Sequence, residues 1–432
     1  MNWFKKVSVL LYILIVLTGC SLLQPADLPP LIATNTPLPP TATPLPTITP
    51  TPIPETYTVE GFQNFISEVE ATDRTLRQGL VNKYVVSAPQ IPVLTQDHAI
   101  FLWQGTPDNV ALLGDMTFWN PEKSIPLNRL FNTDLWYHIA PFESDARLDY
   151  MYLVDGEIQE LDPSNPIQVK SGFGRRSVLS MPNYTVPVEF LPTAADIPAG
   201  TLTTETIDSQ ALVQIRTLFV YKPAQPPTSD NGQYPSVYIH DGSDYLNLID
   251  ATAILDRLIA DGRIPPLVAV FIPPIDRFAE YERNDDYVKF LADEAVPFVR
   301  GKYNTSQSPA ETGTLGASMG GLISAYAALN RPDTFGLVGS QSGAMSYGSD
   351  GVIRQIELMA SADIRFYLTI GSYETELNGD SNQGNLLAGN DRFVAQLRAK
   401  QYEFVYEIRP QGHSWGFWQA TLGETLIWLY AN

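Results

Sequence analysis

The sequence is poor in the residues that most often bind metal ions or form disulfide bonds. It holds one cysteine and four histidines in 432 residues. A single cysteine excludes an internal disulfide framework and a zinc site made of several thiolates. Any imidazole chemistry must come from His98, His138, His240 or His413. We therefore expect an activity that needs neither a metal nor a cofactor.

Basic residues and long apolar segments are also scarce. Lysine and arginine number 27 against 47 aspartates and glutamates, and the formal net charge is −20. A nucleic-acid-binding protein would carry a basic face, so no nucleic-acid partner is expected. Beyond the N-terminus no apolar run approaches the length of a membrane span, which excludes a multi-span protein. The composition, 44% hydrophobic and 17% charged, is instead typical of a globular protein of two or three domains.

The N-terminus has the layout of an export signal. Two lysines at 5–6 precede an apolar run over 7–17, and small residues follow up to Cys20. The sequence LTGC at 17–20 resembles the lipobox of bacterial lipoproteins. This resemblance implies a signal peptide over 1–19, cleavage before Cys20, and attachment of lipid, palmitate included, to the thiol. We therefore expect an extracytoplasmic protein anchored to the bacterial cell membrane. The alternative is an ordinary signal anchor with an incidental cysteine.

A linker and a β-rich region follow the signal. Residues 20–57 are dominated by proline and threonine, which cannot pack as helix or sheet, so this segment should be an extended spacer. Over 58–187, a helical apolar pattern at 61–80 precedes short apolar runs separated by turn residues. Regular short strands predict a β-sandwich with a leading helix. The strands are expected at 99–103, 110–113, 134–139 and 148–154.

The aromatic residues of this region resemble those of early-set sandwiches such as the glycogen-binding-like modules. The segments 114–120 and 150–156, together with Trp136, carry the resemblance. Modules of this type precede the catalytic domain in enterochelin esterases. Trp103, Trp119 and Trp136 could form a sugar-binding platform or belong to the core, and their alternating strand positions favour the core.

The C-terminal half, 205–432, has the pattern of a parallel α/β fold. Continuous apolar segments typical of strands alternate with amphipathic segments typical of helices. Because such strands are buried on both faces, they indicate a sheet covered by helices on both sides. Strands are expected at 212–221, 234–239, 266–272, 312–315, 365–370 and 402–408, and helices at 248–260, 287–303 and 319–329.

The strongest catalytic signal is the sequence Gly-Ala-Ser-Met-Gly at 316–320, which matches G-x-S-x-G. It lies between an apolar strand and an alanine-rich helix, which is the context that a nucleophile elbow requires. The glycines permit a sharp turn and close packing of strand against helix, and they leave the Ser318 hydroxyl at the helix N-terminus. Ser318 is therefore the candidate nucleophile.

A serine nucleophile needs a general base, and the chain order selects one histidine. In α/β-hydrolases the order is serine, acid, histidine, and His413 is the histidine that follows Ser318. Glu374 comes directly after the strand expected at 365–370 and is the candidate acid. It would fix the tautomer of His413 and stabilise its imidazolium form. Other carboxylates in the same part of the chain remain rivals: Glu376, Asp380 and Asp391.

The oxyanion hole is expected to consist of backbone N–H groups. One belongs to Met319, directly after the nucleophile. The other would come from Gly242 or Ser243, in the loop after the strand expected at 234–239. His240 lies at the start of this loop, and we assign the function of the loop to its backbone rather than to the imidazole.

Together these motifs resemble the esterase D and enterochelin-esterase-like family of α/β-hydrolases. The resemblance implies an α/β-hydrolase fold and a serine esterase. The implied substrate is a small-molecule or carbohydrate-linked ester, either a siderophore-type trilactone or an acetyl or feruloyl ester on sugar. It extends from about Arg216 to the C-terminus and is carried by 238–242, 277–281, 290–297, Tyr303, 316–321, 371–374 and 412–413.

Substrate contacts are expected from three residues in segments that should rim the site: Tyr245, Arg277 and Trp415. The two aromatic residues could equally well pack in the core. One departure from the family bears on the substrate. Siderophore esterases carry basic residues that meet an anionic iron-catecholate, whereas this chain is strongly acidic. The alternative interpretation is a non-catalytic, glycan-binding lipoprotein on a hydrolase scaffold, because fold does not prove function. The intact order of Ser318, Glu374 and His413 argues against it.

Overall fold

The computed structural model describes residues 54–190, 197–376 and 384–431. The predicted signal peptide, Cys20 and nearly all of the Pro/Thr-rich linker lie outside these ranges, so the predictions made for them stay predictions. Within the described ranges, no helix combines the length and the apolar character needed to cross a membrane.

Two helices, and not the single one expected over 61–80, open the described chain. A 3₁₀ turn at Glu55–Tyr57 leads into α1 (Val59–Ala71), and α2 follows at Arg77–Ser87. The prediction of one helix is wrong because local hydrogen bonds form a turn in the segment between α1 and α2. The Asp73 carboxylate accepts hydrogen bonds from the N–H and hydroxyl of Thr75, at 2.9 and 2.6 Å, which favours a turn over a helix.

The predicted sandwich region forms two antiparallel sheets. One has the order β1-β2-β6-β5 and the other β4-β3-β7-β10-β9, with β8 paired to β7. Short 3₁₀ turns lie at Asp115–Thr117 and Pro121–Lys123. The strands are β1 (Val93–Leu94), β2 (His98–Gln104), β3 (Val110–Gly114), β4 (Ile125–Pro126), β5 (Asn128–Arg129), β6 (Leu135–Pro141), β7 (Arg147–Val154), β8 (Ile158–Glu160), β9 (Gln168–Ser171) and β10 (Gly174–Ser180).

Alternation along β2 explains why this region is layered. Ala99 and Phe101 belong to the core between the two sheets, whereas Ile100 and Leu102 pack on the side that α1 and α2 cover. Successive strand residues point to opposite faces, so a strand that is apolar throughout needs a covering layer on each side. Trp136 belongs to the core between the sheets, is 6% exposed, and donates its indole N–H to the Gly105 carbonyl. Its burial agrees with the core interpretation.

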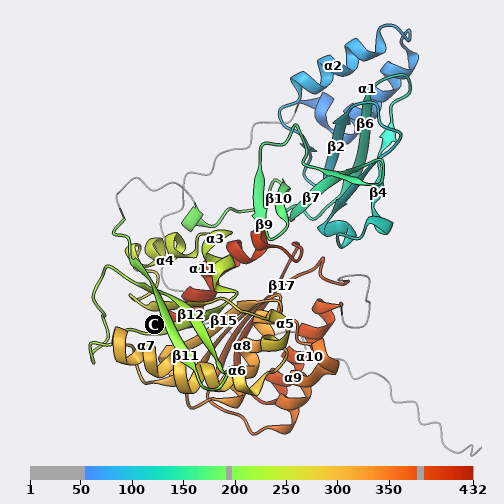
Figure 1. Ribbon diagram of the computed structural model, residues 1–432. Coiled ribbons are helices and arrows are strands. Elements are labelled where there is room, and N and C mark those ends of the chain that lie inside the picture. The colour runs from blue at the N-terminus through green and yellow to red at the C-terminus, as the bar shows by residue number, and fades with distance from the viewer. Residues whose placement is uncertain (1–53, 191–196, 377–383, 432) are drawn as a thin grey trace, which may run out of the picture. The chain divides into compact units, whose positions relative to one another are not determined.

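The second region is built on an eight-stranded sheet with the order β11-β12-β14-β13-β15-β16-β17-β18 (Figure 1). β11 and β12 pair antiparallel at one edge, and β12 pairs antiparallel with β14. The other six strands, β13 to β18, run parallel to one another. The predicted α/β class is confirmed. The strands are β11 (Thr201–Ser209), β12 (Gln214–Lys222), β13 (Ser236–His240), β14 (Val268–Ile272), β15 (Thr312–Ala317), β16 (Leu337–Gln341), β17 (Arg365–Gly371) and β18 (Glu403–Arg409).

Helices cover both faces of this sheet, and each face has its own apolar core (Figure 1). One face packs against α6 (Asp285–Lys289), a π-helical turn (Phe290–Ala295), α7 (Val296–Tyr303), α8 (Met319–Asn330), α9 (Tyr347–Leu358) and α10 (Leu386–Ala399). The other packs against α3 (Gly242–Asn247), α4 (Ala251–Ala260) and α11 (Trp415–Tyr430). Three short helical segments complete the chain: Val188–Phe190, α5 (Arg277–Tyr281) and Pro309–Glu311.

The parallel strands bring the candidate residues to one edge of the sheet. Ser318 follows β15, Glu374 follows β17, and His413 follows β18. Because these strands are parallel, their carboxyl ends lie at the same edge, where α/β proteins bind ligands. The fold thus gathers three residues that are spread over 96 positions of the sequence.

Candidate active site

Ser318 occupies a sharp turn between β15 and α8. Its backbone has φ 59° and ψ −120°, a conformation that a non-glycine residue rarely adopts. The turn is held by the next strand, because Ser318 N–H donates to the Gln341 carbonyl at 2.8 Å and Ala344 N–H donates to the Ser318 carbonyl at 2.9 Å. A side chain at Gly316 would overlap the backbone of Gly320, so this strand and helix can approach only with glycine there. The geometry is that of a nucleophile elbow.

His413 and Glu374 meet at the carboxyl ends of β18 and β17. The Nδ1 atom of His413 lies 2.6 Å from Oε2 of Glu374. The Glu374 side chain is fully buried, whereas the His413 side chain keeps 18% exposure. An ionised carboxylate only accepts hydrogen bonds, so His413 carries its proton on Nδ1 and presents a basic Nε2.

The other oxygen of Glu374 is held by groups that the sequence did not point to. Oε1 accepts a hydrogen bond from the Ser342 hydroxyl at 2.7 Å and one from Gly371 N–H at 2.8 Å. The Trp418 indole N–H donates to the Ser342 hydroxyl oxygen at 2.9 Å, which leaves the hydroxyl proton of Ser342 for Glu374. The ring of Trp418 also stands edge-on to His413, with the centroids 4.9 Å apart. Both members of the His413–Glu374 pair are therefore fixed in orientation.

Ser342 and its neighbour Gln341 were missed because β16 was not singled out in the sequence. Gln341 is fully buried, and its side chain accepts from the Tyr245 hydroxyl at 2.6 Å and donates to the Trp418 carbonyl at 2.7 Å. A usable signal did exist: the segment 337–341 ends in polar residues directly after an apolar start. Polar residues at the carboxyl end of a parallel strand beside the nucleophile strand are candidates for the site.

The predicted oxyanion donors lie at the starts of two helices. Gly242 and Ser243 open α3, and Met319 opens α8. The first N–H groups of a helix have no acceptor within it, so they are available to an anion. The two helix starts approach each other, because a Cβ atom on Gly320 would lie 3.1 Å from Oδ2 of Asp241. Gly242 also has no room for a side chain beside the backbone of β14.

His240 is placed where it cannot act as a general base. It is fully buried, its Nδ1 lies 3.1 Å from the Tyr287 hydroxyl, and its Nε2 lies 3.0 Å from the Thr314 hydroxyl. Burial, together with the positive charge of Arg277, lowers the pKa of His240 to about 3. The imidazole therefore stays neutral with both nitrogens occupied, which agrees with assigning this loop's function to its backbone.

The residues predicted to bind substrate lie in different environments. Trp415 is partly exposed and stands edge-on to the rings of Tyr245 and Trp418. Arg277 is partly exposed, but its guanidinium is paired with Asp241 through two hydrogen bonds of 2.8 Å. Tyr245 is fully buried with its hydroxyl bonded to Gln341, so it packs beneath the site and does not have the rim position expected of it.

The rival carboxylates make other contacts. Glu376 pairs with Lys123, and Asp391 accepts from the Tyr406 hydroxyl at 2.8 Å. Asp380 lies outside the described residues. Glu374 is the candidate acid that meets His413 in the described part of the chain.

Side chains of the β-sandwich contact the loop that carries His413. Arg147 N–H donates to the Pro410 carbonyl at 3.1 Å, and a side chain added at Gly412 would overlap the Asp115 carboxyl group. A side chain at Gly416 would overlap the Arg147 guanidinium. Glycines on either side of His413 thus leave room for two ionisable side chains of the sandwich.

Comparison with known proteins identifies a family and several similar sequences. The model of the Esterase family matches residues 209–429. The chain is 32% identical over 168 residues to the uncharacterized protein YbbA of Bacillus subtilis (strain 168), and the match covers 34% of this chain and 66% of YbbA, slightly less than two thirds of its length. It is 26% identical over 279 residues to the Iron(III) enterobactin esterase of Escherichia coli (strain K12), covering 62% of this chain and 67% of that protein.

A solved structure has the same fold. The crystal structure of ferric enterobactin esterase from Salmonella typhimurium superposes with a TM-score of 0.66 at 20% identity, covering 77% of this chain and 93% of that one. At this identity the likeness concerns the fold. It extends over more of the chain than the 209–429 match does, so it includes part of the sequence before residue 209.

Proposed function

This chain belongs to the Esterase family, and we propose that it is a serine esterase that hydrolyses carboxylic esters through an acyl-enzyme on Ser318. The observation that carries the proposal is the pairing of His413 with a buried Glu374, at the same sheet edge as a serine held in a strained elbow. This arrangement fits acyl transfer, because the serine needs a base and the base needs an orienting acid.

The proposed reaction uses groups of this chain throughout. The Ser318 oxygen bonds to the ester carbonyl carbon while its proton passes to Nε2 of His413, and Glu374 stabilises the imidazolium. Backbone N–H groups of Met319 and of Gly242 or Ser243 hold the oxyanion. The tetrahedral intermediate expels the alcohol, which takes the proton from His413. Water then adds to the carbonyl carbon of the acyl-enzyme while one of its protons passes to His413. The resulting tetrahedral intermediate expels the Ser318 oxygen, which takes that proton back from His413, and the acid is released.

For the substrate we propose a small-molecule or carbohydrate-linked ester, either a siderophore-type trilactone or an acetyl or feruloyl ester. The relative from Escherichia coli is named for iron(III) enterobactin, which supports the first. An exposed aromatic side chain on α5 suits an aromatic acyl group: Phe278 is 57% exposed, and its ring centroid lies 6.4 Å from that of Tyr347. The net charge of −20 gives no general attraction for anionic esters.

Hydrolysis of p-nitrophenyl acetate by the purified chain tests the activity. We expect Ser318→Ala and His413→Ala each to lower kcat about 10⁴-fold or more, and the double variant to lose little further, because the residues act as a unit. Ser308→Ala, in a loop before β15, is the matched control. An active Ser318→Ala enzyme would sink the mechanism. A wild-type chain that neither hydrolyses the ester nor reacts with a fluorophosphonate would favour the non-catalytic, glycan-binding alternative.

We also propose that the chain is an extracytoplasmic lipoprotein anchored through Cys20. The support is the lipobox-like sequence around the single cysteine of the chain. Cys20→Ala should move the protein from the membrane fraction to the soluble fraction of the cell envelope. If the variant stayed in the membrane after a carbonate wash, anchoring through Cys20 would be wrong.

A further inference from the structure

The short helix α5 forms hydrogen bonds with Asp241, at the start of the loop proposed to supply oxyanion donors. Arg277 donates from Nε to Oδ1 of Asp241 and from Nη2 to Oδ2, each at 2.8 Å. The Tyr281 hydroxyl, one turn further along α5, accepts the N–H of Asp241 at 2.9 Å. Asp241 is therefore held at its carboxylate and at its backbone by one helix. It is buried, and it directly precedes Gly242.

The loop needs such support because Asp241 has an unfavourable backbone. Its φ of 54° and ψ of 37° place it in the left-handed region, which residues other than glycine adopt uncommonly. This turn directs the chain from the end of β13 into the start of α3. A change in the Asp241 backbone would reorient the N–H groups of Gly242 and Ser243.

Arg277 also reaches the second half of the oxyanion hole. Its Nη2 donates to the Ala317 carbonyl at 3.2 Å, one residue before Ser318. One guanidinium therefore connects the loop of Gly242 to the elbow that carries Met319. The bidentate fork of arginine suits this task, since it fixes the direction as well as the distance of each contact.

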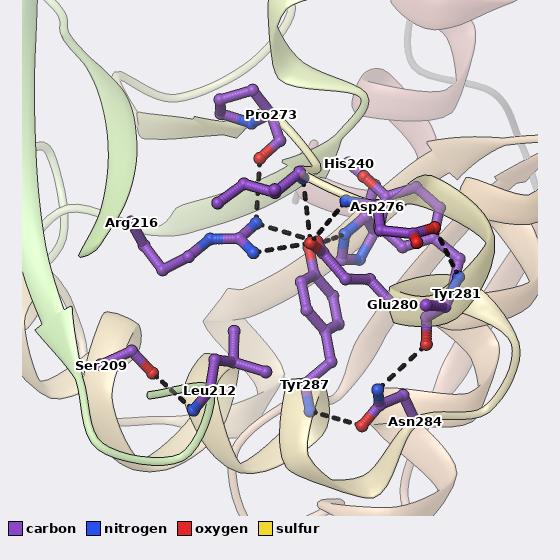
Figure 2. Close-up of polar contacts among 12 residues, drawn as sticks. Ser209, Leu212, Arg216, His240, Pro273, Asp276, Glu280, Tyr281, Asn284 and Tyr287 are labelled. Carbon is purple, nitrogen blue, oxygen red and sulfur yellow. Dashed lines mark hydrogen bonds and ion pairs between the residues drawn. The ribbon is translucent and has the colours of Figure 1, made fainter. Parts of the chain in front are cut away.

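A buried ion pair anchors α5 to the sheet (Figure 2). Arg216 of β12 donates to both oxygens of Glu280, at 2.7 and 2.9 Å, and to the Pro273 carbonyl at 3.0 Å. Glu280 also accepts the N–H groups of Ile275 and Asp276 at the start of α5, at 2.9 and 3.0 Å. The Arg216 side chain is fully buried. These contacts fasten α5 to β12 and to the loop before it, so the helix that holds Asp241 is itself held in place.

We propose that Arg277 is a positioning residue that aligns the two oxyanion donors, and that its charge serves Asp241 instead of an anionic substrate. This inference rests on the proposed esterase function and differs from the substrate-binding role expected from the sequence. Arg277 acts through the backbone N–H groups of Gly242 and Met319, so its loss should affect the transition state more than substrate binding.

Two p-nitrophenyl esters of different charge separate these roles. We expect Arg277→Gln to lower kcat about 10- to 100-fold on both p-nitrophenyl acetate and the anionic mono-p-nitrophenyl succinate, with KM changed by less than about 3-fold. Arg277→Lys should recover part of the loss. Asp241→Asn should resemble Arg277→Gln, and the double variant should lose little more than either single one. Arg257→Gln, which removes the Arg257–Asp261 pair on α4, is the matched control and should leave both rates unchanged.

The outcomes are distinct. A loss confined to the succinate ester, seen as a raised KM, would show that Arg277 binds substrate and would overturn the proposal. Amide hydrogen exchange gives a readout that needs no activity: Arg277→Gln should speed exchange in a peptide covering 241–247, and Arg257→Gln should not. An inactive wild-type chain with this exchange pattern would remove the esterase function and keep the positioning role. Unchanged exchange together with unchanged kcat would remove the positioning role alone.

Discussion

The two sides of the candidate site are supported in different ways. On the oxyanion side, Asp241 is held by α5, and α5 is held by Arg216, all within the α/β region. There the sandwich reaches the far end of α3, where Lys170 donates to the Asn247 carbonyl at 3.3 Å. On the histidine side, the loop of His413 also contacts Asp115 and Arg147 of the sandwich. The difference predicts that the proposed oxyanion donors depend mainly on contacts within the α/β region, whereas the position of His413 depends on both regions.

The acid lies between the same two sets of contacts. Glu374 accepts hydrogen bonds from Ser342 and Gly371 within the α/β region. The preceding residue, Tyr373, instead contacts the sandwich. The Tyr373 hydroxyl donates to Glu143 at 2.7 Å, and its ring packs on the core of the sandwich. The His413–Glu374 pair is thus bordered by sandwich residues on both of its loops. The comparison can be tested by weakening one support at a time.

The largest effect is expected from the support inside the α/β region. Glu374→Gln keeps the shape of the side chain but removes the charge that orients and stabilises His413, so kcat should fall roughly 10³- to 10⁴-fold with KM little changed. Asp391→Asn is the matched control, because Asp391 contacts Tyr406 on the exposed surface. If Asp391→Asn were crippled and Glu374→Gln silent, the acid would be assigned to the wrong carboxylate.

The sequence predicted the α/β side better than the sandwich side, and the reason is physical. G-x-S-x-G, the strand before it and the helix after it are neighbours in the chain, so their pattern can be read locally. Ser318, Glu374 and His413 follow β15, β17 and β18, which are parallel strands of one sheet in chain order. Even in the α/β region one strand was not expected: the edge strand β11 is polar and largely exposed, so it has no apolar run to indicate it.

Contacts between distant segments could not be predicted in this way. Nothing in the sequence around Gly412 or Gly416 shows that Asp115 and Arg147 lie beside them. Likewise, no pattern in the sequence predicts that Arg277 pairs with Asp241, which lies 36 residues earlier, and not with the substrate. Residues that connect two loops, or two regions, are the ones that one-dimensional patterns leave undetermined.

A smaller effect should follow from disturbing the sandwich contact. Gly412→Ala places a methyl group against the Asp115 carboxyl group and displaces the loop of His413, so kcat should fall about 10- to 100-fold, as expected for an ångström-scale misplacement of a catalytic group. Asp115→Gly should restore part of the activity in the double variant, since it vacates the space. Gly301→Ala on α7, where a methyl group meets open space, is the control. A Gly412→Ala enzyme of full activity would show that the sandwich does not position the base.

The two sides should also respond to pH in opposite directions. Burial and the neighbouring Asp149 raise the pKa of Asp115 to about 7. The hydrogen bonds from the Asp149 N–H and the Trp119 indole, and the charge of Arg147, lower this pKa but do not outweigh the burial. On the oxyanion side, burial lowers the pKa of His240 to about 3. Between about pH 4 and 7 the folded chain binds more protons than the unfolded chain at Asp115, so this group makes stability fall as pH rises. At His240 the unfolded chain binds more protons between about pH 3 and 6.5, so stability rises.

The smallest expected effect is a change in how the free energy of unfolding depends on pH. It isolates the contribution of Asp115, on the sandwich side. Because Asp115 and His240 act in opposite directions, the wild-type slope alone reveals neither, and the difference between variants is needed. Asp115→Asn removes the titration of Asp115, so its free energy of unfolding should rise relative to wild type between about pH 4 and 7, by a few kcal/mol at most, since one pKa unit corresponds to about 1.4 kcal/mol. Urea unfolding at several pH values measures this, with Asp230→Asn on an exposed loop as the control for net charge. Parallel curves for Asp115→Asn and wild type would mean that Asp115 is ionised in the folded chain throughout this range, and that the histidine loop packs against a charged carboxylate.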